Sequence, residues 1–125
     1  MSIPVQLSDL ARVLTEHGDG YLLTAGARGV KAITVTARVD GDVLRIPGGS
    51  AGTSANLEAG PTATLLFPPR VPRGHTLLVD GTAQTVDDGF VLTPVSAVLH
   101  RPADHADGGA TGATGSACGH DCEPV

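Results

Sequence analysis

Aromatic residues and lysine are scarce in this chain of 125 residues, and both scarcities narrow its function. Tyr21, Phe67 and Phe90 are the only aromatic side chains, and tryptophan is absent. Lys31 is the only lysine, and the formal net charge is −5. Proteins that bind nucleic acids need clustered basic residues and commonly stack bases on aromatic rings. The composition therefore argues against a nucleic acid as partner.

Long apolar runs and a cysteine framework are also missing. No apolar segment approaches the length of a membrane span, and residues 1–4 (MSIP) have neither a basic region nor an apolar core of a signal peptide. We therefore expect a cytoplasmic protein with no membrane partner. Both cysteines lie within the last eight residues, so they do not form a disulfide framework for a core.

What the chain does contain is small and β-branched apolar residues punctuated by turn formers. Apolar residues make up 41 % of the chain, with 17 glycines and 9 prolines. This composition favours short strands and tight turns. The pattern predicts strands at Tyr21–Ala25, Val30–Val39, Val43–Ile46, Thr62–Phe67, Thr76–Val86, Phe90–Thr93 and Val95–Leu99. It also predicts a helix at Ser8–Glu16 and a second, short helix that ends at about Glu58. We predict a mainly β protein, a closed or partly closed barrel of six to seven antiparallel strands with one or two short helices.

The last part of the chain has a different composition. From Ala103 onward it has many Gly, Ala and Thr residues and no Leu, Ile or aromatic residue. Such a segment buries too little apolar surface to offset its ordering entropy. We therefore predict one barrel domain at residues 1–102 and a flexible tail at residues 103–125.

A cluster of metal-ligating residue types ends that tail. Cys118, His120 and Cys122 place two thiols and an imidazole within five residues, which suits zinc. A fourth ligand would come from His100, His105 or Asp121. The spacing is not one of the strong zinc patterns, so a flexible thiol pair that closes into a local disulfide is the alternative.

The strongest candidate site is the loop Gly48–Ser54, which leads into the second predicted helix. A loop of Gly, Ser and Thr that opens a helix offers backbone N–H groups and hydroxyls to a phosphate, with the positive end of the helix dipole behind them. The candidate ligands are Ser50, Thr53 and Ser54. The alternative is an exposed connection in which the glycines serve only as turns.

The residues after this loop are similar to a known family. Asn56-Leu57-Glu58-Ala59-Gly60-Pro61, followed by the strand Thr62–Phe67, resembles the split-barrel flavoproteins of the pyridoxamine-phosphate oxidase superfamily and their deazaflavin-binding relatives. The similarity runs from about Leu7 to Pro102. It implies a split β-barrel homodimer with ligand sites between subunits, the cofactor phosphate at the loop and the ring against Thr34 and Thr36.

One departure concerns the charge at the phosphate. The family usually places a lysine three residues before the asparagine, where this chain has Thr53, and the loop carries no cation. Arg70 and Arg73 in the proline-rich segment are the substitutes we predict, although both also fit ordinary solvated arginines. Arg45 and Lys31 are further alternatives.

The resemblance implies an FMN- or deazaflavin-dependent oxidoreductase without specifying its substrate, and no side chain stands out as an acid or a base. One alternative is a module that binds a flavin, haem or other planar ligand without turnover. Another is a metal or redox role of the tail. The consecutive apolar residues Leu77, Leu78 and Val79 predict a strand buried on both faces, with the barrel interior on one and a dimer interface on the other.

Overall fold

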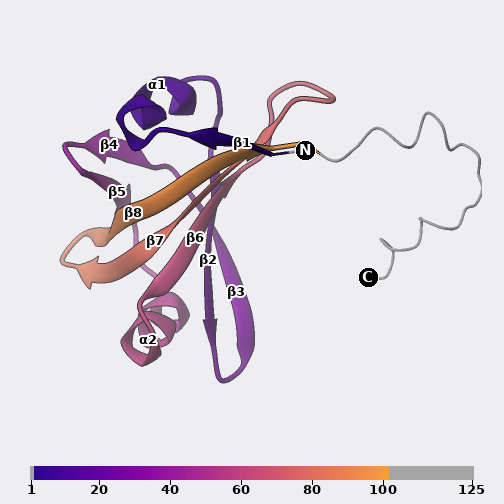
Figure 1. Cartoon of the computed structure of the whole chain (residues 1–125). Helices are drawn as coiled ribbons and strands as arrows, with labels where there is room; N and C mark the ends of the chain where they lie inside the picture. Colours follow the sequence, from indigo (N-terminus) through magenta and orange to yellow (C-terminus); the bar gives the residue numbers. More distant parts are fainter. Residues whose placement is uncertain (1, 102–125) are drawn as a thin grey trace, which may run out of the picture.

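The computed structural model describes residues 2–101, which form an antiparallel sheet of eight strands with short helices against it (Figure 1). Each predicted apolar segment with period-2 alternation lies in a strand. The strands are β1 (Ser2–Val5), β2 (Gly20–Gly26), β3 (Gly29–Val35), β4 (Arg38–Asp40), β5 (Val43–Pro47), β6 (Thr62–Phe67), β7 (Thr76–Val86) and β8 (Gly89–His100). The helices are a 3₁₀ turn (Leu7–Asp9), α1 (Leu10–Leu14) and α2 (Ala51–Ala59).

The order of the strands shows that the sheet curls into a barrel. The order is β3-β2-β6-β7-β8-β5-β4, with β1 added to β8, so β3 and β4 lie at opposite ends of the path. Only Thr36 and Ala37 separate β3 from β4 in the chain. Two intervening residues span at most about 11 Å, so the two ends must approach each other. No ladder joins β3 to β4 within residues 2–101, which leaves the barrel split and confirms the predicted fold class.

The strand boundaries differ from the prediction in three places. The segment Val30–Val39 forms two strands, because β3 pairs with β2 and β4 pairs with β5 across the split. The last two predicted strands are one, β8, in which an irregularity opposite Asp80 and Gly81 accommodates Pro94. Strand β1 was not predicted, because its short, mostly exposed sequence becomes a strand only by pairing with β8.

The N-terminal helix is shorter than predicted. Ser8 lies inside the 3₁₀ turn, and Asp9 occupies the position before α1 without a capping side-chain hydrogen bond. Leu10 and Val13 are nevertheless buried against the barrel, as the helical spacing predicts. Within residues 2–101 no helix has the length and apolar character needed to cross a membrane.

The core fills the concave side of the sheet. Its largest fully buried side chains are Phe67, Phe90, Leu22, Leu44, Ile46, Leu65, Leu77 and Leu92. Burying each leucine contributes about 1.5–3 kcal/mol. On β7 the side chains of Leu77 and Val79 are fully buried, whereas Leu78 points to the convex face and is half-buried. The barrel interior is thus on the Leu77 and Val79 side as predicted, whereas burial of the Leu78 side in a dimer interface stays a prediction.

Candidate functional site

The loop before α2 is held in place at both of its ends. The N–H of Gly48 donates to the carbonyl oxygen of Asp88 at 3.1 Å. The hydroxyl of Ser50 caps α2 by accepting from the N–H of Thr53 at 3.2 Å. In a helix capped this way, the first two N–H groups, here those of Ala51 and Gly52, have no intrahelical acceptor. They form the positive end of the α2 dipole.

The three predicted hydroxyls have distinct environments. Ser50 serves as the helix cap, and the hydroxyl of Ser54 accepts from that of Thr85 at 3.0 Å. Thr53 is fully buried, and its hydroxyl has no hydrogen-bond partner within residues 2–101. A buried hydroxyl without a partner costs about 1–3 kcal/mol, so such an atom in a native structure needs a reason.

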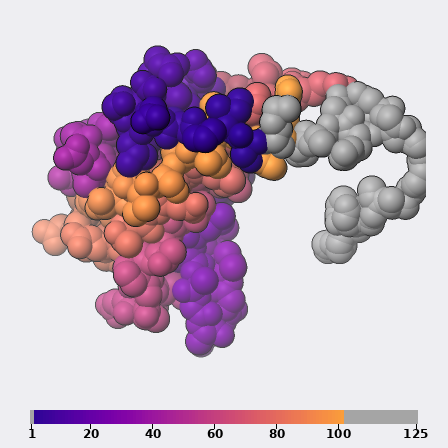
Figure 2. All heavy atoms as spheres, viewed as in Figure 1, coloured from indigo at the N-terminus to yellow at the C-terminus, as the bar shows by residue number. Residues whose placement is uncertain are grey.

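Asn56, the first residue of the family-like motif, attaches α2 to β2. Its Nδ2 donates to the hydroxyl of buried Thr24 at 3.1 Å. A Cβ at Gly26 would lie 2.1 Å from the Oδ1 of Asn56, so the asparagine can occupy this place only over a glycine. In Figure 2, α2 (pink) and the β2–β3 hairpin (purple) project side by side from the same end of the molecule. Asn56 thus attaches α2 to the end of β2.

Lys31 is the cation that the structure places at this helix end. It lies opposite Thr24 on β3, on the face toward α2. A Cβ at Gly52 would lie 2.9 Å from its Cδ and Cε and 3.4 Å from its Nζ, so the lysine stem crosses the first turn of α2 where a side chain is absent. Within residues 2–101, Lys31 makes no hydrogen bond or ion pair. Sequence reasoning named Lys31 only as one alternative, because the direction of its side chain depends on the α2 packing.

The other alternative from the same part of the chain, Arg45, is already engaged. Its Nε donates to Asp40 at 2.5 Å, and both side chains are about half exposed. The hydrogen bond to Arg45 and the charge of Arg45 lower the pKa of Asp40 below its ordinary value. Arg45 is therefore a surface ion-pair partner.

Arg70 and Arg73 lie at the opposite end of the barrel from α2, in the loop between β6 and β7 (Figure 1). The Nη2 of Arg70 donates to the carbonyl oxygen of His17 at 2.7 Å, just before β2 begins. Asn56 of α2 contacts the far end of β2, at Gly26. Seven strand residues extend about 23 Å. Within one chain the structure does not bring these arginines to the Gly48–Ser54 loop.

Thr34 and Thr36 are exposed and lie away from α2. Thr34 is on the convex face of β3, beside Tyr21 of β2. The hydroxyl of Thr36, just beyond β3, donates to the carboxylate of Asp19 at 2.9 Å. The predicted ring site and the predicted phosphate site are thus on opposite faces of the β2–β3 hairpin.

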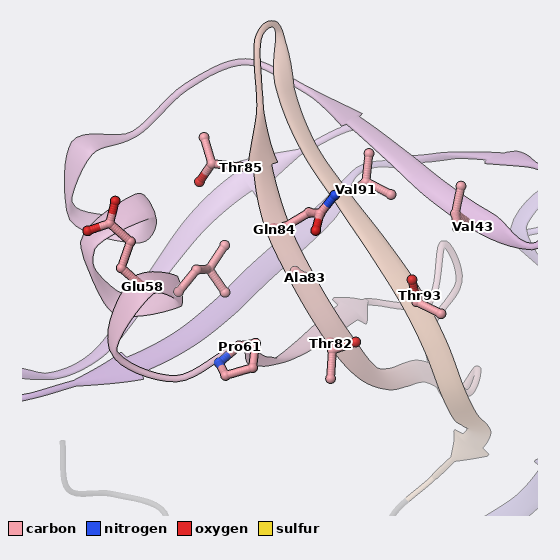
Figure 3. A pocket seen from close by; sticks show the side chains of 10 residues that line it. Val43, Glu58, Pro61, Thr82, Ala83, Gln84, Thr85, Val91 and Thr93 are labelled. Atoms are coloured by element: carbon pink, nitrogen blue, oxygen red, sulfur yellow. The ribbon is translucent and has the colours of Figure 1, made fainter.

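An open groove of about 650 Å³ runs beside α2 over strands β5, β7 and β8 (Figure 3). Its lining includes hydroxyl and amide groups from Thr82, Gln84 and Thr93, and Glu58 is its one ionisable residue among those described. Val43, Leu57 and Val91 add apolar surface. Thr85 connects the groove to the first turn of α2 through its bond to Ser54. The alternation of β7 puts Thr82 and Gln84 on one face, but sequence reasoning missed the groove because α2 forms one of its walls.

The predicted zinc ligands Cys118, His120 and Cys122 lie outside the described residues, as do His105 and Asp121. His100 lies at the end of β8, where its Nδ1 is 3.1 Å from the hydroxyl of Ser2. Residues 2–101 contain no group of three His, Cys, Asp or Glu side chains arranged to hold a metal ion.

Solved structures share this architecture. The chain is similar to a pyridoxamine 5'-phosphate oxidase-like protein from Listeria innocua, with 17 % identity over 76 % of this chain and 92 % of that one and a TM-score of 0.55. It is also similar to the FAD binding protein from Mycobacterium smegmatis, with 13 % identity over 81 % of this chain and all of that one and a TM-score of 0.57. The fold is therefore that of the pyridoxamine-phosphate oxidase-like split barrels, which confirms the resemblance.

Two curated proteins show a closer sequence relationship. The uncharacterised proteins Mb0449c of Mycobacterium bovis and MT0457 of Mycobacterium tuberculosis are each 34 % identical to the chain over 139 aligned positions, covering 94 % of this chain and 92 % of theirs. The chain belongs to the same family as these mycobacterial proteins. No protein-family model matches it.

Proposed function

We propose that this protein binds FMN or a deazaflavin and acts as a flavin- or deazaflavin-dependent oxidoreductase. The observation that carries the proposal is the mixed polar and apolar groove beside α2, which Leu57 and Glu58 line from the C-terminal end of the helix and which the Thr85–Ser54 hydrogen bond links to the first turn. Ligand pockets of about 300–1,000 Å³ with a few placed polar groups are typical of cofactor sites. The fold shared with an FAD-binding protein supports the same assignment.

The residues present fit a phosphate at the first turn of α2. The N–H groups of Ala51 and Gly52 have no acceptor within the helix, and the Ser50 cap stabilises the turn that presents them. The Thr53 hydroxyl has no hydrogen-bond partner within residues 2–101. That Ser50, Thr53 and Ser54 bind the phosphate stays a prediction. In this proposal the backbone N–H groups provide most of the hydrogen-bond donors.

We place the ring system in the groove. Thr82, Gln84 and Thr93 offer hydrogen bonds to ring carbonyl and nitrogen atoms, and Val91 and Leu57 offer apolar contact. The resemblance implies instead that the ring lies against Thr34 and Thr36, and this stays the competing prediction. We favour the groove because Thr34 lies on an exposed strand face. The bound cofactor would supply electron-transfer chemistry, and the protein would orient it and exclude water.

We further propose a homodimer that closes this groove. Across the convex face, cross-strand pairing aligns one row of mostly apolar side chains, which are Tyr21, Leu66, Leu78, Val98 and Pro4. Tyr21 is 41 % exposed and the next three are half-buried. Thr82 and Gln84 of the groove share the Leu78 side of β7. A second copy packed on this row would bury apolar surface and narrow the groove.

Cofactor binding is tested first by the visible absorption spectrum of the purified protein and by fluorescence titration with FMN and a deazaflavin. Saturable binding of either is expected. Thr93→Trp would fill the groove and weaken binding, whereas Val95→Trp, on the same strand but outside the groove lining, would leave it unchanged. Absence of saturable binding for both compounds would refute the proposal. Equal binding by the two variants would show that the ring does not bind in the groove.

Binding without turnover is the second candidate, and the groove lining favours it in one respect. Glu58 is the one ionisable residue among the described residues that line the groove, and proton transfer to a substrate commonly needs a positioned acid or base. Measuring reduction of the bound cofactor by a nicotinamide donor, with Glu58→Gln as the variant, separates the two functions. The cytoplasmic location and the role of the tail stay predictions.

A further inference from the structure

A second cavity, of about 220 Å³, lies where β4 and β5 meet the turn between β7 and β8. Three charged residues line it, and they are Arg38 of β4, Arg45 of β5 and Asp88 of the turn. Its apolar lining comes from Ile46, Val86 and Phe90. Cavities of about 300–1,000 Å³ hold drug-sized ligands, so this one suits a smaller molecule. It shares no lining residue with the groove beside α2 and is therefore a separate site.

The two arginines lie directly opposite each other in the β4–β5 pair. Side chains in such positions have Cβ atoms about 4.5–5.5 Å apart, and like charges there are unfavourable. Asp40 compensates Arg45, whose Nε donates to its carboxylate. Arg38 acts on Asp40 through its charge alone and makes no hydrogen bond or ion pair within residues 2–101. The cavity therefore contains a guanidinium group whose hydrogen-bond donors are available.

Asp88 supplies the opposite charge in the same cavity. Its backbone carbonyl oxygen accepts from the N–H of Gly48, which holds the turn against the end of β5. Its carboxylate makes no hydrogen bond or ion pair with any residue that the structure describes. Arg38 and Asp88 thus line one cavity with opposite charges and do not pair with each other. A molecule that carries both a carboxylate and an ammonium group could bind the two of them at once.

We propose that this cavity binds an α-amino acid with an apolar side chain of about the size of leucine, with its carboxylate on Arg38 and its ammonium group on Asp88. Together with Asp40, the charged residues of the cavity are two cations and two anions. A simple anion or a simple cation would therefore gain only one of the two contacts. The apolar lining would take up the side chain of the amino acid. This inference does not depend on the flavin function.

The test is a titration of the ¹⁵N-labelled full chain with L-leucine at neutral pH and constant ionic strength. The amide resonances of Arg38 and Asp88 should shift saturably. Two analogues each lack one charged group: 4-methylpentanoate has no ammonium, and 3-methylbutylamine has no carboxylate. Each should bind about tenfold more weakly than leucine, the effect expected for the loss of one charge-assisted contact.

Charge variants assign each contact to its residue. Arg38→Gln should weaken leucine binding about tenfold and abolish the preference for leucine over 3-methylbutylamine. Asp88→Asn should weaken it by a similar factor and abolish the preference over 4-methylpentanoate. A residue with a merely structural role would not change these preferences selectively. Arg28→Gln and Asp87→Asn remove the same charges outside the cavity lining and should change binding less than about twofold.

Three results would overturn the proposal. The first is wild-type protein whose Arg38 and Asp88 amides show no saturable shift with L-leucine. The second is binding of 4-methylpentanoate as tight as that of leucine, which would show a plain anion site in which Asp88 has no role. The third is leucine binding by folded Arg38→Gln that equals wild type.

Discussion

Replacing Gly26 by alanine should destabilise the protein through a single contact, the one with Asn56. The added Cβ would lie 2.1 Å from the Oδ1 of Asn56 and 2.8 Å from its Cγ, whereas ordinary contacts begin at 3.4 Å. The asparagine must therefore move by more than 1 Å. That movement breaks its bond to the Thr24 hydroxyl, which is only 3 % exposed.

The expected loss has two parts. Overpacking of a well-filled junction costs about 1–3 kcal/mol, and leaving the buried Thr24 hydroxyl unpaired costs about 1–3 kcal/mol. Because a shift of Asn56 relieves the overlap as it breaks the bond, we expect a total of about 2–4 kcal/mol for Gly26→Ala. Asn56→Ala, which loses only the hydrogen bond and some packing, should cost about 1–2 kcal/mol.

The double variant decides whether this contact is the cause. In the Asn56→Ala background the new Cβ has an ordinary neighbour at 3.6 Å, the Cβ of residue 56, so Gly26→Ala should cost about zero. The free energy of unfolding is measured by urea denaturation at unchanged m-value. Gly60→Ala is the matched control, since a Cβ there meets no atom within 4 Å. Additivity of the two single variants within about 0.5 kcal/mol would refute the reasoning.

Three further predictions concern the core, a surface ion pair and the domain boundary. Leu65→Ala removes a fully buried side chain and should lower the free energy of unfolding by about 2–5 kcal/mol. Val95→Ala is the control, because Val95 is 69 % exposed and its loss should cost less than about 0.5 kcal/mol. Similar losses for both variants would show that Leu65 does not lie in the core. Arg45 lowers the pKa of Asp40, so the pair stabilises the folded state above the ordinary pKa of an aspartate, and this small contribution disappears as the pH falls through the lowered value. Asp40→Asn should accordingly be slightly less stable than wild type at pH 7 and equal to it at pH 2, and a difference that grows on acidification would contradict this sign. Truncation after Pro102 should leave the melting temperature unchanged, because the removed residues contain no Leu, Ile or aromatic side chain. If the full chain binds stoichiometric zinc and the truncated chain does not, the metal role of Cys118, His120 and Cys122 is supported.

The sequence by itself determined the fold class and most of the local structure. Period-2 alternation and turn residues were sufficient for the strands Thr62–Phe67 and Thr76–Val86, which appear with the predicted bounds. A short helix ending near Glu58 was also predicted and is present, but the prediction placed Ala51–Ser54 in the preceding loop, whereas α2 begins at Ala51 and is capped by Ser50. These features depend on neighbours within a few residues along the chain, so their signal is present in the sequence.

Tertiary structure decided the rest of the candidate site. Whether Lys31 or Arg70 reaches the loop depends on which end of the barrel each occupies, and this follows from strand pairing between residues far apart in sequence. The groove exists because α2 folds against β7, and β1 is a strand only because β8 accepts it as a partner. Side-chain direction and strand pairing depend on contacts across the whole sheet, and local propensity carries no information about such contacts.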